Sequence, residues 1–526
     1  MKIFLNLAII VLSLIGLADA TFITYQEFTG QIPPCSPGFQ CEVVLQSKWA
    51  QIGPVPLAAL GMVYYSIVLI LGIWMYAGLP LPAKPRWFKT YGIQPLDLLQ
   101  AITSFGVFFT AYLLILMGFI INAWCTYCLL SAFTSGMLFV VARIYAIKNR
   151  PSNSYFLKGA TLNLGHWVYV NMLKKLFFLF DPEFIHVILV NCGRILGSNA
   201  ITKWATGLIL GFNSPANQKK LAGISFPGIV GLAAGFDYNA DLTQVLPSLG
   251  FGWHSIGTIT LESYDGNPRP RLQRMPSSKA LLVNKGLKNL GARATIAKLT
   301  GLEFKIPVGI SIASTNRHFA DTKSQILDIT TCFKLFENSP VRHAYYELNI
   351  SCPNTFGGEP FTTPERLTLL LAALAKIKIT RPIFVKMPID QSEKETLSLL
   401  KVISDFKLEG IIIGNLTKDH ANPHVSTADK TMWKASKGNV SGKPTFQRSN
   451  NLIALAKKHY GKKFIIVGTG GIFSPEDAIK KLELGADLVQ LITGMIFEGP
   501  QLIGRINRTL AYPSATDVYS GKTVSL

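Results

Sequence analysis

Apolar residues fill almost all of the first 150 positions, whereas later positions alternate between short apolar and polar stretches. Four apolar runs in the first part are each near the roughly 20 residues that a helix needs to cross a bilayer, although the first is short. They are Ile3–Leu17, Pro56–Ala77, Leu98–Ile121 and Leu129–Ile147. This pattern predicts a four-helix transmembrane bundle over residues 1–150.

Basic residues beside these runs predict their orientation. Lys84–Lys89 lies between the second and third runs and Lys148–Arg150 follows the fourth, whereas Thr21–Ala50 and Asn122–Tyr127 contain few basic residues. Cytoplasmic loops carry the excess of Lys and Arg, so the basic segments and everything after Arg150 are expected in the cytoplasm. The membrane is expected to be a bacterial inner membrane.

The first apolar run has two interpretations. Met1-Lys2, the apolar core and Ala18–Ala20 also resemble a cleaved signal peptide. We favour a retained helix, because it completes a consistent four-helix arrangement. Cleavage would leave the orientation of the other helices unchanged.

The remainder of the chain has the alternation of an α/β enzyme. Amphipathic stretches such as Thr363–Ile377 and Ser474–Leu484 separate short β-rich runs. The eight runs are Gly228–Ala234, Trp253–Ile259, Pro307–Ile312, Tyr345–Ile350, Pro382–Met387, Gly410–Ile413, Phe464–Val467 and Leu488–Ile492. This eightfold alternation predicts a (β/α)8 TIM barrel over residues 223–526, with its chemistry at the carboxyl ends of the strands.

Residues 151–222 are predicted to form a linker and a short helical leader. Tyr169–Ile195 is amphipathic, aromatic and basic, which suits a helix lying in the lipid headgroup layer. A helix that caps the barrel is the alternative.

Composition narrows the classes of function. Hydrophobic residues make up 49% and charged residues 15%, which excludes a disordered chain. The 51 Lys and Arg against 30 Asp and Glu give a net charge of +21, which in an apolar chain favours contact with anionic lipid. No aromatic–basic interleaving or zinc spacing supports a nucleic-acid partner.

Four of the seven cysteines lie in the membrane part. Cys35 and Cys41 follow the first run, and Cys125 and Cys128 form a CxxC pair at the start of the fourth. A thiol at a helix start is readily deprotonated, and one pair can pass a disulfide to the other. We favour this redox role over two inert disulfides or a zinc site, and no metal is expected.

The first 150 residues resemble the vitamin K epoxide reductase family. The resemblance rests on Cys35–Ala50, Gly53–Tyr65 and the CxxC pair. It implies quinone reduction with electrons from protein thiols, with Cys128 nearest the quinone, Cys125 beside it, and Cys35 and Cys41 as the shuttle pair. Ser47 matches the family's serine near the quinone. No fused thioredoxin-like part is evident, which implies a separate periplasmic thiol protein as partner.

Chemistry-bearing residues follow the predicted barrel strands. Glycine-rich turns at Gly468–Gly471 and Thr493-Gly494 suit a phosphate, because glycine lets backbone N–H groups close on it. Several asparagine amides suit a planar ring with carbonyl and N–H groups, and Lys386 suits a flavin. Cys352 suits a general base, with a small buried filler as the alternative.

Residues from about Tyr169 to Leu510 resemble the dihydroorotate dehydrogenase family. The matching motifs are Gly231–Asp237, Gly266–Leu272, Asn349–Thr355, Gly468–Gly471 and Thr493–Pro500. The resemblance implies oxidation of dihydroorotate to orotate by FMN, in pyrimidine biosynthesis, with Cys352 as base. Residues implied to bind substrate are Asn284, Lys285, Gly286, Asn349, Asn354 and Asn415. Those implied to bind FMN are Ala234, Gly235, Thr258, Ser311, Lys386, Ser441, Gly442, Gly470, Gly471, Thr493 and Gly494.

The leader is similar to that of the class 2 enzymes of this family. Its Phe180-Asp-Pro-Glu-x-x-His186 pattern implies helices that dock on the membrane and form a tunnel for a quinone acceptor. Two residues depart from class 2: Cys352 replaces a serine base, and Tyr238 replaces a lysine that reaches substrate and flavin. We hypothesise that Lys285 or Lys288, in a loop one residue shorter than usual, supplies the lost charge.

Other functions remain open at this point. The barrel could act on a related substrate, or could be a degenerate anchor that leaves only the thiol–quinone part active. Both halves reduce quinone by resemblance, so the fusion is expected to co-localise two quinone users rather than link them in one relay.

Overall fold

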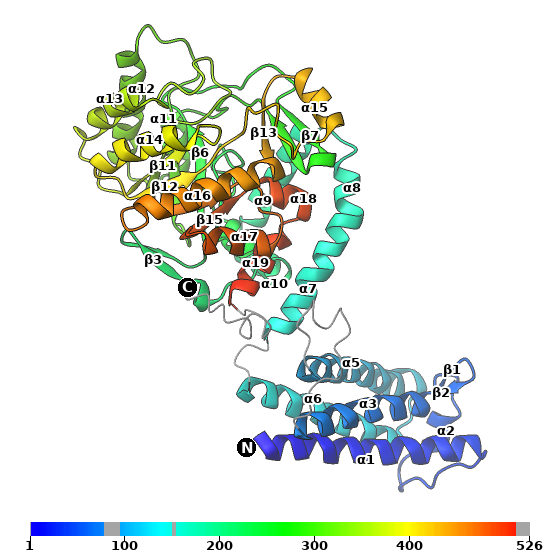
Figure 1. Ribbon diagram of the computed structural model, residues 1–526. Helices are drawn as coiled ribbons and strands as arrows, with labels where there is room; N and C mark the ends of the chain where they lie inside the picture. The colour runs from blue at the N-terminus through cyan, green and yellow to red at the C-terminus, as the bar shows by residue number, and fades with distance from the viewer. Residues whose placement is uncertain (1, 78–94, 150–153, 512–526) are drawn as a thin grey trace. The chain divides into compact units, whose positions relative to one another are not determined.

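The computed structural model describes residues 2–77, 95–149 and 154–511, which fall into two compact units, 1–157 and 158–526 (Figure 1). The predicted basic segment Lys84–Lys89 lies outside the described residues, as do the first residues of the predicted linker.

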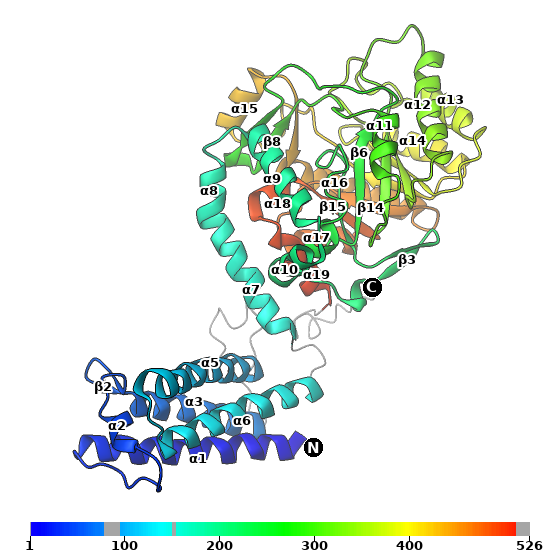
Figure 2. The same ribbon diagram turned by 180° about the vertical axis from the view of Figure 1, so that it is seen from behind.

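The first unit is a bundle of four long helices. These are α1 (Lys2–Phe28), α3 (Leu57–Ala77), α5 (Pro95–Ile115) and α6 (Thr126–Asn149). Helix α1 lies against α3 and α6, and α5 lies against the same two helices (Figure 2). Four segments are long and apolar enough to cross a membrane, which confirms the predicted number: Ile3–Phe28, Leu57–Ala77, Leu98–Ile121 and Thr126–Tyr145.

The first helix is longer than its apolar run, which ends at Leu17. The hydroxyls of Thr21 and Thr24 donate to the carbonyls of Leu17 and Ala20 one turn earlier, so these polar residues fit within the helix. Smaller elements complete the unit: a π-helical turn η1 (Leu116–Ile121), helix α2 (Cys41–Leu45) and the hairpin β1 (Gln51–Ile52) and β2 (Val55–Pro56).

The leader of the second unit consists of two helical runs, and the predicted amphipathic stretch Tyr169–Ile195 spans the break between them. One helical run comprises α7 (Ser154–Val168), η2 (Tyr169–Leu173) and α8 (Lys174–Phe177), and a second begins at α9 (Pro182–Leu196), followed by α10 (Ala200–Ile209). The break arises because Asp181 accepts from the Phe184 N–H and caps α9, and Pro182 suits only a first helical turn. Helices α9 and α10 meet at 117°.

The core of the second unit is a closed barrel of eight parallel strands, as predicted. Their order around the barrel is β5 (Val230–Leu232), β6 (Trp253–Ile259), β9 (Val308–Ile312), β10 (Tyr345–Asn349), β11 (Ile383–Met387), β12 (Gly410–Ile413), β14 (Ile465–Thr469) and β15 (Leu488–Leu491). The helices of this barrel are α11 (Ala292–Leu299), α12 (Thr322–Glu337), α13 (Pro364–Leu374), α14 (Glu393–Asp405), α16 (Phe446–Tyr460), α17 (Pro475–Glu483), α18 (Thr493–Glu498) and α19 (Gln501–Ala511).

A small antiparallel sheet was not predicted. It joins β7 (Leu272–Met275), β8 (Ala280–Val283) and β13 (Asn439–Gly442), and α15 (Thr427–Lys434) packs near it. Because Asn284 directly follows β8, and Ser441 and Gly442 lie on β13, this sheet positions three predicted site residues. The hairpin β3 (Lys219–Leu221) and β4 (Ile224–Phe226) precedes the barrel.

We expect Trp253→Ala to destabilise the barrel by about 3–5 kcal/mol, because the substitution leaves a large cavity. The Trp253 indole is fully buried between Phe226 and Tyr345 and donates to the Ile229 carbonyl at 3.1 Å. Unfolding of the detergent-purified chain measures the change. Trp204→Ala, at a side chain 67% exposed on α10, is the matched control. Equal stability of the two variants would show that the Trp253 indole does not stabilise the barrel core.

Candidate functional site

Predicted site residues on or after strands β6, β9, β10 and β12 meet at the carboxyl end of the barrel. The Asn349 amide donates to the Thr258 hydroxyl at 2.9 Å, and Thr258 pairs with Ser311 at 3.0 Å. Asn415, after β12, donates to the Ser351 hydroxyl at 3.0 Å and reaches Asn349 at 3.5 Å. Parallel strands end on one side, so residues far apart in sequence form one polar network.

A buried ion pair underlies this network. The Lys386 ammonium on β11 lies 3.3 Å from a carboxylate oxygen of Glu347 on β10, and Ser311 donates to the same oxygen at 3.1 Å. The other oxygen of Glu347 is buried without a hydrogen-bond partner among the described residues. Glu347 was not predicted as a site residue. Its position could have indicated one, because a carboxylate within the apolar run Tyr345–Ile350 is buried and needs a partner.

A second group of amides surrounds the loop after β8. Asn267 donates to the Asn284 side chain at 2.9 Å and to the Asn354 carbonyl at 3.0 Å. Asn316 donates to the Gly286 carbonyl at 2.9 Å. A Cβ on Gly286, which has a φ of +67°, would meet Asn267 at 2.3 Å, so only glycine fits there.

Asn267 and Asn316 were not predicted as site residues. Asn267 lies inside the Gly266–Leu272 motif, whose matching residues could have drawn attention to it. Asn316 follows β9 by four positions and had no signal beyond its place after a strand.

Cys352 lies two residues after Ile350 and is half-buried. Burial raises the pKa of its thiol to about 11, while the backbone N–H of Asn354 and the charge of Lys386 act in the opposite direction. The thiol is therefore mainly protonated at neutral pH.

Glycines form a cradle at the ends of β14 and β15. Gly470 and Gly471 have φ of +90° and +73°, and a Cβ on them would meet Thr445 at 2.6 Å and Phe446 at 2.4 Å. A Cβ on Gly494 would meet the Ile472 carbonyl at 1.7 Å. Only glycine fits at these positions, because the chain's own atoms already occupy the place of a side chain.

The remaining predicted residues border this cradle and the network. Ser441 pairs with Thr493 at 2.9 Å, and Gly442 has a φ of +100° with Thr493 beside it. Gly235, next to Ala234, donates from its N–H to the Gly257 carbonyl at 2.7 Å, immediately before Thr258.

Tyr238 and Lys285 lie against each other. The Lys285 ammonium is 4.7 Å from the centre of the Tyr238 ring, and His186 of α9 stacks on that ring at 5.4 Å. The ammonium is buried without a hydrogen-bond partner among the described residues, and burial lowers the pKa of Lys285 to about 8. Of the two candidate lysines, Lys285 is therefore the one that adjoins the Tyr238 position.

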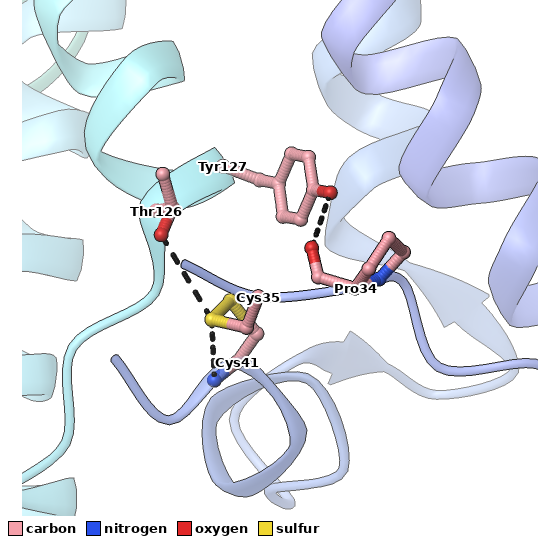
Figure 3. The surroundings of a disulfide bond; sticks show 5 residues. All are labelled: Pro34, Cys35, Cys41, Thr126 and Tyr127. Atoms are coloured by element: carbon pink, nitrogen blue, oxygen red, sulfur yellow. Dashed lines mark hydrogen bonds between the residues drawn. A yellow bond between two sulfur atoms is a disulfide. The ribbon is translucent and has the colours of Figure 1, made fainter. Parts of the chain in front are cut away.

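All four membrane cysteines lie in one cluster of the first unit. Figure 3 shows the surroundings of Cys35 and Cys41, which lie beside Thr126 and Tyr127 of the CxxC segment. Cys35 and Cys41 form a disulfide, and Cys125 and Cys128 carry free thiols. Cys35 lies 3.8 Å from the Thr126 hydroxyl at the start of α6, within the CxxC segment. The Tyr127 hydroxyl donates to the Pro34 carbonyl at 2.7 Å and ties the two segments together.

A cavity of about 320 Å³ opens beside this cluster within the same unit. Its lining is largely apolar and includes Cys128 and Ser47, which were both predicted to lie near a quinone. Cys125 is fully buried and does not line the cavity. The Cys128 thiol of the CxxC pair therefore borders an apolar cavity, which is the kind of site that binds an apolar molecule.

Comparisons with known proteins support both family resemblances that the sequence indicated. Residues 217–512 match the model of the dihydroorotate dehydrogenase family, and residues 7–143 match that of the vitamin K epoxide reductase family. Both are oxidoreductase families.

Curated relatives match the second half. The dihydroorotate dehydrogenase (quinone) of Sinorhizobium medicae is 33% identical over 353 residues, covering 65% of this chain and 91% of its own. That of Nostoc punctiforme is 34% identical over 336 residues, covering 62% and 88%. The ligand-free DHODH structure from Eimeria tenella has a TM-score of 0.55 at 24% identity, covering 65% and 96%, and thus shares the fold. The chain belongs to the dihydroorotate dehydrogenase family, and it carries a vitamin K epoxide reductase family domain at its N-terminus.

Proposed function

We propose that the barrel oxidises dihydroorotate to orotate and passes the electrons to a membrane quinone. The observation that carries this proposal is the convergence of amides, Lys386 and Cys352 at one mouth of the barrel. The relatives named dihydroorotate dehydrogenase (quinone) support the choice of substrate and acceptor. Orotate is a pyrimidine, so the reaction would belong to pyrimidine biosynthesis.

The residues at the mouth fit FMN as cofactor. The glycine-rich turns after the seventh and eighth barrel strands are where barrels of this kind commonly bind a phosphate. The carboxylate oxygen of Glu347 that has no hydrogen-bond partner among the described residues can accept a hydrogen bond from a flavin ring. When bound, FMN would supply a hydride acceptor for the substrate and an electron donor for the quinone. The residues proposed to hold it are Ala234, Gly235, Thr258, Ser311, Lys386, Ser441, Gly442, Gly470, Gly471, Thr493 and Gly494.

The chain's own residues would bind and deprotonate the substrate. Amides both donate and accept, so the four asparagines can pair with the ring carbonyl and N–H groups. They are Asn284, Asn349, Asn354 and Asn415, with Gly286 shaping their loop. Cys352 would take a proton from the substrate carbon onto its sulfur, and Lys285 would offer its charge to the substrate carboxylate.

The helix pair α9–α10 would carry the barrel on a lipid bilayer. It exposes large apolar side chains, including Phe184 at 55%, Ile195 at 63% and Ile201 at 77%. Such a surface would sit in the headgroup layer, and a quinone would enter beside it. We place the barrel on the cytoplasmic side of the membrane and the cysteines on the outer side, by the charge rule applied to the sequence.

The first unit would oxidise protein thiols and reduce quinone. The grouping of four cysteines beside the cavity supports this second function. An outer thiol protein, thioredoxin-like and separate from this chain, would reduce the Cys35–Cys41 disulfide. The resulting thiols would reduce a Cys125–Cys128 disulfide, and Cys128 would deliver the two electrons to a quinone in the cavity.

We expect Cys352→Ala to slow reduction of the bound flavin by dihydroorotate about 10²- to 10⁴-fold, the usual contribution of a general base. The base acts as thiolate and burial raises its pKa to about 11, so the wild-type rate should rise from about pH 7 to about pH 10. Anaerobic stopped-flow absorbance measures both effects. A wild-type rate in Cys352→Ala would reject the base.

We expect Lys285→Ala to weaken orotate binding about ten- to a hundred-fold, because losing a charged hydrogen bond costs about 1.5–3 kcal/mol. Since burial lowers the pKa of Lys285 to about 8, the ammonium loses its charge above that pH and orotate should bind more weakly there. Spectral titration of the flavoprotein measures affinity. Lys288→Ala is the control, and a larger loss in that variant would move the role to Lys288.

We expect Cys128→Ser to abolish reduction of menadione by dithiothreitol and to leave dihydroorotate-dependent orotate formation unchanged. The serine keeps the side-chain size but cannot form a disulfide. Cys192→Ser, at an exposed cysteine of α9, is the control and should retain both activities. Full dithiol-dependent activity in Cys128→Ser would exclude this thiol as the electron donor.

A further inference from the structure

The cavity of the first unit contains an acidic side chain that the proposed thiol chemistry does not use. Asp19 of α1 lines it together with Cys128, and only 7% of Asp19 is exposed. One carboxyl oxygen of Asp19 is buried without a hydrogen-bond partner among the described residues. An ionisable group within a membrane span is costly, and such groups commonly serve proton or ion transfer.

A second acidic residue lines the same cavity nearer the end of α1. Glu27 follows Asp19 by eight residues, a rise of about 12 Å along a helix. It is half-buried, and one of its carboxyl oxygens also lacks a hydrogen-bond partner among the described residues. Ile23, between them, lines the cavity as well, so this face of α1 follows the cavity towards the helix end.

The other ionisable groups facing this space are already engaged or assigned. The Tyr65 hydroxyl of α3 donates to the Ser131 carbonyl at 2.8 Å and pairs with Thr134 at 2.8 Å. The Tyr64 hydroxyl pairs with Ser135 at 3.3 Å. Cys128 of α6 is the proposed electron donor, and the lining residues of α5 carry no charge. Among the described residues that line the cavity, the two carboxyls are therefore the ionisable groups with an unused oxygen.

Quinone reduction needs protons, which such a carboxyl can supply. A quinone takes up two electrons and two protons to become a quinol, and two thiols release two electrons and two protons on forming a disulfide. Electrons can pass directly from the Cys128 sulfur to a quinone in contact with it, but each proton needs a donor group within hydrogen-bond reach of a quinone oxygen.

We propose that Asp19 is the proton donor to the quinone in this cavity and that Glu27 relays protons to it from the outer end of α1. This inference rests on the proposed quinone reduction by the first unit. As the Cys125–Cys128 S–S bond forms and both S–H bonds break, the Asp19 O–H bond breaks and a quinone O–H bond forms. Asp19 then regains a proton and repeats the transfer to the second oxygen. The proton comes either from the thiols or from outside through Glu27, and in the second case the two thiol protons are released to the outside. The sum is quinone plus dithiol giving quinol plus disulfide, with the carboxyls unchanged.

The experiment uses the full chain in detergent, dithiothreitol as donor and menadione as acceptor, without dihydroorotate. We expect Asp19→Asn, which keeps the shape but carries no transferable acid proton, to slow quinol formation about 10²-fold or more. Asp19→Glu should restore part of the rate. Glu27→Gln should slow the reaction less and change its pH profile, because relay from outside is lost while the donor remains.

Controls separate a folding defect from a proton-transfer defect. Asn6→Ala alters a buried polar residue of the same helix that does not line the cavity, and it should keep the wild-type rate. In each variant, thermal unfolding and the content of Cys35–Cys41 disulfide should match the wild type. The solvent deuterium isotope effect on quinol formation should increase in Asp19→Asn, which a purely structural role would not produce.

The outcomes are distinct for the two claims. A wild-type chain that does not reduce menadione would overturn the proposed function of the first unit, and the role of Asp19 with it. A wild-type chain that reduces menadione, together with an equally fast Asp19→Asn variant, would overturn only the role of Asp19.

Discussion

The buried pair of Lys386 and Glu347 is the interaction on which the mouth of the barrel depends. A charge inside a β-barrel is stable only when an opposite charge and hydrogen bonds replace its water. Glu347 provides the opposite charge, and Ser311 shares its carboxylate oxygen. Removing one partner of such a pair typically costs about 3–5 kcal/mol, because the other is left buried and uncompensated. The pair thus joins β10 to β11 close to Asn349, which lies opposite Lys386 in the register of the two strands.

Much of this arrangement was predictable, because the order of the strands along the chain determines where the residues that follow them lie in a barrel. Eight β-rich runs separated by amphipathic stretches sufficed for the closed barrel, and residues following the runs necessarily share one end of it. Asn349, Lys386 and Asn415 were found in this way.

The rest depends on contacts that spacing does not encode. Asn267 and Asn316 reach the loop at Gly286 from other parts of the chain, and only the folded loops bring them there. The helical leader is interrupted at Asp181, where the side chain of this residue caps the start of α9. The amphipathic pattern continues through this position and does not mark the interruption. Asp19 was first interpreted as part of a possible cleavage site, since a short tripeptide carries no information about the helices that bury it.

The two units share a proposed acceptor but use unlike chemistry to reach it. The first would transfer electrons from thiols to a quinone inside an apolar cavity. Such a cavity contains few proton donors, so a carboxyl group would supply the protons that the quinone needs. The second would bind its substrate and cofactor at the polar end of the barrel, through the buried ion pair, the asparagine amides and backbone groups. Anchoring both to one membrane would place them beside the same quinone pool without requiring any transfer between them.

The central claim is that the barrel mouth is a flavin site that oxidises dihydroorotate. Its most direct measurement is the visible absorbance spectrum of the detergent-purified chain under anaerobic conditions, before and after dihydroorotate and then a short-chain ubiquinone. We predict a yellow flavin band that bleaches with dihydroorotate and returns with the quinone, with one orotate formed per flavin. A colourless protein, or a flavin band that dihydroorotate leaves unchanged, would contradict the claim.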